Sequence, residues 1–425
     1  MEFIRVFTNP KRCMQRLGFL KPLIWQASRT ATNNLPTLGN HLIESVSQKV
    51  SVTLTPQLQE YIRVALTDTQ RKAHQRITSK RPLDEELEEV KIQLELQDVL
   101  LSNSDLPSKR GKLVKEDWKK YPYLALNLGL LRKGTYSLLV RGQSFLSLIS
   151  GNEIKGFGRP VVKEVNGGVN LLLLTIPQKL LLLFSFIEGD GDVLKLFYKR
   201  LLQTSEGFAD REVGGYLPEI YRVIIKENRS KARSGDDLLR IQRLLDTANK
   251  IERWTKAKPT GSKDILMESV TPRLEPFVDI GLLSKPDPFV YRYQVTNATR
   301  AFIEPLINAE NIDNFIQHSF FEATDKGFSL NGQHRIDRET ILPAIQKAYD
   351  VLKSPLGYAP ILEVALLAGI CSITEMGKFF EISEAMDALK SLQKERSELV
   401  RFNVDRWGVL TFVKFSNDIK KLIEK

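Results

Sequence analysis

Cysteine is nearly absent from this 425-residue chain, whose only two cysteines are Cys13 and Cys371. So few thiols exclude a disulfide framework and a cysteine-rich zinc site, and they are typical of a protein from a reducing compartment. Histidine is also scarce, and the four histidines lack the spacing of metal ligands: His41, His74, His318 and His334. The sequence therefore predicts a cytoplasmic protein that needs no metal and no cofactor.

The chain also lacks an apolar run long enough to cross a bilayer. Its most apolar stretch is residues 169–187, which Asn170 and Pro177-Gln178-Lys179 divide into two short runs. A membrane-spanning helix needs about 20 consecutive apolar residues. The apolar segment of a secretory signal is missing as well. We expect no membrane partner, and we interpret 169–187 as a buried strand followed by a core helix.

Acidic residues are outnumbered by basic ones, 51 against 62, which gives a net charge of +11. The excess is concentrated in three blocks, residues 1–43, 107–165 and 222–263. Each Lys or Arg in such a block can neutralise one phosphate and release a counterion. This distribution favours a nucleic acid partner over the alternative, a set of solvated helix faces.

The first basic block has two interpretations. Residues 1–43 suit an arm that binds DNA, and their few acids also fit a mitochondrial transit peptide. Pro10, Pro22 and Pro36 interrupt the amphipathic helix that a transit peptide needs. Residues 44–106 then read as mainly helical, and the length of the whole chain predicts two to four domains.

A pattern of helix, Gly-Leu-Leu, loop, strand and helix occurs twice. The first copy has LALNLGLL at residues 124–131, a strand at 136–140 and a helix at 143–149. The second has LEPFVDIGLL at 274–283, a strand at 289–295 and a helix at 299–307. Gly129 and Gly281 fit left-handed helix C-caps, where glycine has no steric penalty.

A third version follows at the C-terminal end. We predict helices at 340–352, 361–371 and 383–398, the last with Ser383 as its N-cap. The strands 399–404 and 409–415 flank a turn at 405–408. Three helices ending in a two-stranded hairpin resemble a winged helix, a variant of helix-turn-helix. We therefore expect a mainly α fold with small β-hairpins, built of tandem winged-helix modules.

The second copy has the preceding helices of such a module. They are residues 178–187 and 193–202, separated by the turn Glu188-Gly189-Asp190-Gly191-Asp192. The predicted division of the chain is a basic N-terminal arm and helical region at 1–106, modules at 107–175 and 176–310, a linker at 311–339 and a third module at 340–425.

The chain is similar to the DNA-recognition half of type IIS restriction endonucleases, in which three winged-helix subdomains stand in tandem. The similarity lies in the apolar helix and acidic-glycine turn at 178–192, in Gly207-Phe208 and in Leu217-Pro218-Glu219. It implies double-stranded DNA recognition in a restriction or defence complex. The similarity does not extend to a nuclease domain, so we expect a protein partner to supply any cleavage.

No catalytic constellation emerges from the sequence. Asp105 with Asp117-Trp118-Lys119 has the spacing of a metal-dependent nuclease, but residues 108–120 are charged and loop-like rather than strand-like. The run Gly189-Asp190-Gly191-Asp192 lacks the Lys-Ser/Thr of a phosphate-binding loop. We expect that the protein is not an enzyme and keep a metal-dependent nuclease as the weakest alternative.

The candidate DNA-binding residues form two groups of bases. The first group lies before and within the turn of the first repeat. The second lies in the sequence RSKARSG, residues 229–235, and just before it, and we predict that this segment is a flexible loop. The candidates are Lys109, Arg110, Lys112, Lys115, Lys119, Lys120, Arg132, Lys133, Arg141, Lys226, Arg229, Lys231 and Arg233.

The third module is a weaker DNA-binding candidate. Acids offset the bases of its would-be recognition helix, 383–398, which suits a helix that contacts protein. Two function classes therefore remain. The first is a non-catalytic double-stranded DNA binder that serves a restriction, repair or transcription complex. The second is a winged-helix scaffold that mainly holds protein partners.

Overall fold

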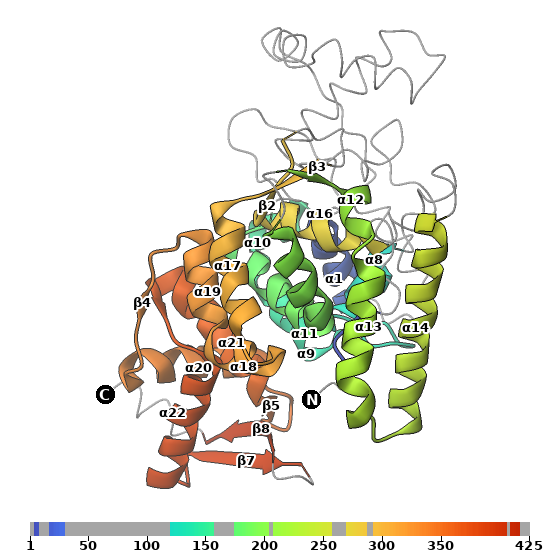
Figure 1. Ribbon diagram of the computed structural model, residues 1–425. Coiled ribbons are helices and arrows are strands. Elements are labelled where there is room, and N and C mark those ends of the chain that lie inside the picture. Colours follow the sequence, from blue (N-terminus) through green and yellow to red (C-terminus); the bar gives the residue numbers. More distant parts are fainter. Residues whose placement is uncertain are drawn as a thin grey trace, which may run out of the picture.

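The computed structural model describes residues 4–7, 17–29, 120–156, 174–203, 207–256, 269–286, 292–405 and 409–416. The described part of the chain is mainly helical with a few small strands, which confirms the mainly α fold class (Figure 1). The predicted helices of residues 44–106 lie outside the described residues.

Helix α11 (Ile176–Leu201) runs through the middle of the molecule, with the other helices around it (Figure 1). Leu180 to Leu183 are fully buried, so the core helix predicted here is confirmed. The turn predicted at 188–192 is wrong, because α11 continues through it. A Cβ atom on Gly189 would meet the Phe7 ring, and one on Gly191 would lie 3.0 Å from Ile312. The two glycines thus allow two other segments to pack closely on an unbroken helix.

The described N-terminal residues belong to the core and do not form a free arm. Lys21 Nζ, with a fully buried side chain, donates to Glu153 Oε1 at 2.5 Å, and Arg5 pairs with Asp313. Leu20 and Ile24 are also buried. The helices of this region and of the first repeat are η1 (Leu17–Phe19), α1 (Leu20–Arg29), α8 (Lys120–Asn127), α9 (Val140–Ser147) and α10 (Gly151–Gly156).

The second repeat contains a small antiparallel sheet whose strand order is β1-β3-β2. Its strands β1 (Phe208–Ala209), β2 (Leu283–Ser284) and β3 (Arg292–Val295) are shorter than predicted or only partly described. The helices around it are α12 (Asp210–Gly214), α13 (Leu217–Asn228), η3 (Arg229–Lys231), α14 (Gly235–Lys256), α16 (Thr271–Ile280) and α17 (Asn297–Asn308).

Both predicted glycine caps are present. Gly129 has φ +67° and Gly281 has φ +96°. After each, the leucine N–H bonds back into the helix, from Leu130 N to Ala125 O and from Leu282 N to Phe277 O, both at 2.8 Å. This bond is one of the pair that defines the Schellman motif. The first repeat has an isolated bridge at Leu131 and Leu138 where we predicted a full strand.

The predicted linker at 311–339 is wrong, because this segment is packed. It forms α18 (Ile312–His318), α19 (Phe320–Phe328) and β4 (Gln333–His334). Phe315, Phe320 and Phe321 are fully buried. They lie against one another and against aromatic rings of α11 and α17. Phe321 also packs against Gly369 of the third repeat, so this cluster lies between the second and third repeats.

The third repeat follows the predicted order closely. It contains α20 (Arg338–Leu352), β5 (Ala359–Pro360), α21 (Ile361–Cys371), the π-helical η4 (Ser372–Met376), β6 (Lys378–Phe379), α22 (Ile382–Glu395), β7 (Val400–Val404) and β8 (Leu410–Phe415). The N-cap of α22 is Glu381, not Ser383. Strands β5, β8 and β7 form an antiparallel sheet in that order, and β4 pairs in parallel with β6.

One cluster of buried apolar side chains extends from Ile4 to Phe415. The predicted boundaries at 175 and 310 therefore do not separate the core into independent parts. No helix in the described part of the chain is both long enough and apolar enough to cross a bilayer.

Candidate nucleic-acid interface

The second group of predicted DNA-binding residues lies on a helical hairpin of α13, η3 and α14 (Figure 1). Lys226 is in the last turn of α13, Arg229 and Lys231 are in η3, and Arg233 is in the link to α14. The predicted flexible loop is therefore wrong, because the four cations are held on ordered backbone between two helices. Such backbone positions a charge more sharply than a loop does.

The local sequence closes this hairpin. Ser234 caps α14 by accepting from Asp237 N at 3.1 Å, and the Asp237 carboxylate accepts from Arg233 N and Ser234 N, both at 3.0 Å. The Arg233 N–H bond holds the pKa of Asp237 below its ordinary value, so Asp237 stays charged as a cap. Buried Ile220 and Ile224 anchor α13. The turn is thus fixed by its own backbone bonds, leaving the side chains of the cations outside.

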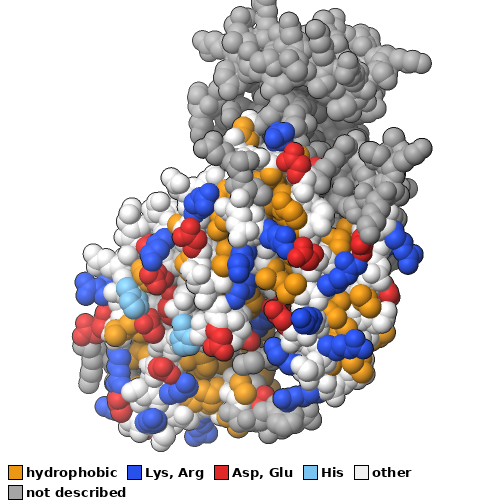
Figure 2. All heavy atoms as spheres, viewed as in Figure 1, with side chains coloured by type: hydrophobic (Ala, Val, Ile, Leu, Met, Phe, Trp, Pro, Cys, Tyr) orange, Lys and Arg blue, Asp and Glu red, His pale blue; other side chains and the backbone are white. Residues whose placement is uncertain are grey.

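The four cations of the hairpin turn are exposed, and none forms an ion pair with a described residue. Other exposed cations behave differently: Arg222, in the same helix α13, pairs with Glu252. Arg200, Lys326, Lys347 and Lys390 likewise pair with carboxylates. Figure 2 shows Lys and Arg side chains over α13 and α14, on the right of the view. The four side chains of the turn therefore have no ion-pair partner among the described residues, although the Asp237 carboxylate caps the same turn.

The first group of predicted residues is only partly described. Arg132 and Lys133 are exposed in the turn between Leu131 and Leu138 and form no ion pair with a described residue. Lys120 begins α8. Lys109, Arg110, Lys112, Lys115 and Lys119 lie outside the described residues, as do Asp105 and Asp117 of the nuclease spacing. Arg132 and Lys133 are thus the exposed cations of this group among its described side chains.

Arg141 is a correction to the predicted set. Its side chain is 8% exposed and bridges two carboxylates, Glu188 on α11 and Glu363 on α21. Its guanidinium carbon also lies 5.0 Å from the centre of the Phe184 ring. The two carboxylates outweigh the effect of burial and raise the pKa of Arg141 above its ordinary value. This arginine joins the three repeats and is not accessible to a phosphate.

The would-be recognition helix α22 has few free cations. Lys390 pairs with Asp387, Arg338 of α20 pairs with Glu395, and His334 Nε2 lies 2.9 Å from Glu384. These pairs reduce the positive potential of the exposed face of α22, in line with the acidic character predicted for it.

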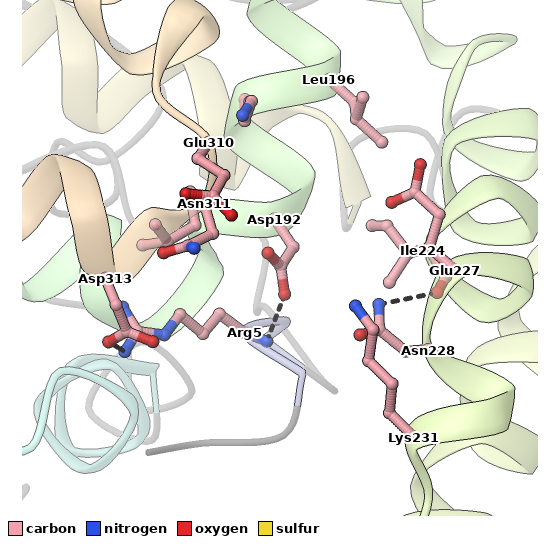
Figure 3. Close-up of a pocket in the computed structure, with 12 residues that line it drawn as sticks. Arg5, Asp192, Leu196, Ile224, Glu227, Asn228, Lys231, Glu310, Asn311 and Asp313 are labelled. Atoms are coloured by element: carbon pink, nitrogen blue, oxygen red, sulfur yellow. Dashed lines mark hydrogen bonds and ion pairs between the residues drawn. The ribbon is translucent and has the colours of Figure 1, made fainter.

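A polar cavity of about 520 Å³ lies between α11, α13, α18 and the N-terminal segment (Figure 3). Arg5 crosses its floor, donating from its backbone N to Asp192 at 2.8 Å and from Nη2 to Asp313 at 2.6 Å. Burial raises the pKa of Asp192 and lowers that of Lys195.

Carboxylates outnumber cations in the lining of this cavity, since Glu227 and Glu310 add to the two aspartates. Lys231 of the hairpin turn also lines this cavity, so the cavity borders the basic turn, but four carboxylates against three cations disfavour a phosphate inside it. Among the described residues, no group of His, Cys, Asp and Glu is suited to hold a metal ion.

Sequence reasoning missed a second basic surface, formed by Arg401 and Lys414 on neighbouring strands. The register pairs these two residues directly. The period-two alternation of 399–404 and 409–415 contained this signal, because it assigns the residues of each strand to two faces.

Comparisons with protein-family models, curated proteins and solved structures found no match to this chain.

Proposed function

We propose that this protein is a non-catalytic double-stranded DNA-binding protein that serves as the recognition subunit of a restriction or defence, repair or transcription complex. The observation that carries the proposal is the turn of the α13–α14 hairpin, with Lys226, Arg229, Lys231 and Arg233 exposed and without ion pairs to described residues. Each of these four cations can neutralise one phosphate. A protein partner would supply any cleavage, and the protein would act in the cytoplasm.

The winged-helix assignment supports the same function. In the third repeat the order is α20, β5, α21, α22, β7 and β8, with β8 between the other two strands. In the second, α11, β1, α12, α16, β2 and β3 follow the same order with β3 in the middle, and α13 and α14 lie between α12 and α16. We propose that both are winged-helix modules and that the α13–α14 hairpin is an insertion that carries the basic surface.

Titration of a labelled random-sequence duplex over a salt series tests the proposal. A variant with all four hairpin cations changed to Ala should lose affinity for every sequence. Its slope of log K against log salt should fall by roughly 3 to 4 units if all four contact phosphate. The matched control changes four cations that are paired with acids, Arg200, Lys326, Lys347 and Lys390, to Ala. It removes the same amount of positive charge as the hairpin variant. Equal losses in the two variants would show that only net charge matters and would reject the hairpin as the DNA site.

A scaffold that mainly binds protein partners is the second candidate. The ion pair of α22 with Arg338 and its contact with His334 favour it for the third repeat. A parent protein whose weak duplex binding shows little salt dependence would favour the scaffold over the DNA binder.

The remaining alternative is a metal-dependent nuclease. Cutting of DNA by the purified chain with Mg²⁺ or Mn²⁺, abolished by Asp117→Ala, would establish the nuclease and reject the non-catalytic proposal.

A further inference from the structure

The antiparallel sheet of the third repeat has one face directed away from the core. Val400 and Val413 are fully buried on the inner face. Their strand neighbours point outward, and the register pairs Arg401 with Lys414 and Asn403 with Phe412. Directly paired residues share one face of a sheet, so these four side chains lie together on the outer face.

Two like charges stand directly opposite each other on this face. Such a cross-strand pair destabilises a sheet unless something neutralises it. Neither Arg401 nor Lys414 forms an ion pair with a described carboxylate, and the β7 and β8 residues of this face include no acid. Lys414 Nζ lies 4.9 Å from the centre of the Tyr358 ring, which holds it at the surface of the sheet. The arrangement fits an anionic ligand that spans both strands.

An exposed aromatic ring lies beside the two cations. Phe412 is 41% exposed. Its cross-strand partners are Asn403 and Pro360, neither of which is charged. At the lower end of the view in Figure 2, where Figure 1 places β7 and β8, apolar side chains are exposed beside Lys and Arg.

Cations beside an exposed ring are the combination by which proteins bind single strands, because bases stack on the ring and phosphates contact the cations. In an intact duplex the base faces are stacked on one another, so this ring favours unpaired bases.

We propose that the outer face of the β5-β8-β7 sheet binds single-stranded DNA. A base stacks on Phe412, and the adjacent phosphates contact Arg401 and Lys414. This site differs in ligand and position from the proposed duplex site, although the turn of the α13–α14 hairpin and the sheet both reach the lower end of the molecule in Figure 1.

The test is fluorescence anisotropy of a labelled oligo-thymidine strand of about 12 nucleotides, within the usual range of single-strand sites, with the full-length protein. Phe412→Ala should weaken binding roughly tenfold or more, and Phe412→Tyr should retain it because the ring remains. Changing Arg401 and Lys414 to Ala should lower the salt slope by about 1.4, at about 0.7 for each phosphate contact. Val351→Ala removes an exposed apolar side chain of α20, and Lys394→Ala removes one exposed cation of α22; as controls, both should bind as the parent does.

The outcomes separate this inference from the duplex proposal. Unchanged single-strand binding in Phe412→Ala and in the double variant would overturn the inference, whatever the hairpin variant does to duplex. Equal losses for single strand and duplex would also overturn it, because the sheet would then belong to the duplex site. Tighter binding of the matching RNA strand, lost in the same variants, would reject DNA as the occupant. Loss of duplex binding in the hairpin variant with unchanged single-strand binding would support both sites.

Discussion

Replacing Arg141 by Ala tests whether the ion-pair bridge between repeats holds the molecule together. Removal of one partner of a buried pair costs about 3–5 kcal/mol, because it leaves a buried charge uncompensated. The Glu188 side chain is 28% exposed and can turn toward water, whereas that of Glu363 is only 13% exposed. We therefore expect the lower end of this range, about 3 kcal/mol. Combining Arg141→Met with Glu363→Gln should restore most of the lost unfolding free energy, because no unpaired carboxylate then remains buried at position 363.

Urea unfolding of the full chain, followed by circular dichroism, measures this loss as a shift of the midpoint at an unchanged m-value. Arg132→Ala is the control: it removes an exposed cation and should change stability by less than about 0.5 kcal/mol. Folded Arg141→Ala should bind duplex as tightly as the parent does. An Arg141→Ala protein with parental stability and weakened DNA binding would refute the reasoning and return Arg141 to the DNA surface.

Three further predictions concern single residues. Burial raises the pKa of Glu381 to about 7, so its stabilising contribution is complete below the ordinary pKa near 4.5 and is lost as pH rises through about 7. The free energy of unfolding, measured by urea titration across this range, should therefore fall by about 3 kcal/mol more in the parent than in Glu381→Gln. Gly281→Ala places a side chain at φ +96° and should cost about 1–2 kcal/mol of unfolding free energy, with Gly281→Asn costing less; equal stability of parent and alanine variant would contradict the strain. Arg401→Glu replaces a like-charge pair with Lys414 by an opposite one, so thermal unfolding should show a gain of about 0.2–1 kcal/mol together with loss of single-strand binding; a destabilised variant would mean that Arg401 has a structural role.

The sequence predicted local structure correctly where the conformational preference of single residues determines it. Gly129 and Gly281 have the predicted left-handed conformation because glycine adopts it without penalty. The helices of the third repeat were predictable from apolar spacing for the same local reason. Strand lengths were not, because strands such as Leu283–Ser284 are two residues long and depend on a partner distant in the sequence.

Packing overrode local propensity at residues 188–192. Two glycines and three acids favour a turn, yet they continue α11. Asp190 is held in the helix by distant groups: its carboxylate accepts from Arg273 Nε at 2.6 Å and from Phe7 N at 2.9 Å. Only the folded chain brings these donors together, so no window of sequence contains the signal.

The candidate DNA site shows the same limit for charge. Arg222 and Lys226 are one turn apart on α13 and count equally in the sequence, but only Arg222 reaches a carboxylate, Glu252 of the facing helix α14. A net charge over residues 222–263 therefore predicts that a basic surface exists without identifying its residues. The surface consists of the cations that the fold leaves without acids, and these are decided by which helices pack together. The hairpin variant and its paired-cation control remove equal charge. Comparing their DNA affinities therefore shows whether binding depends on where the cations lie or only on the net charge of the protein.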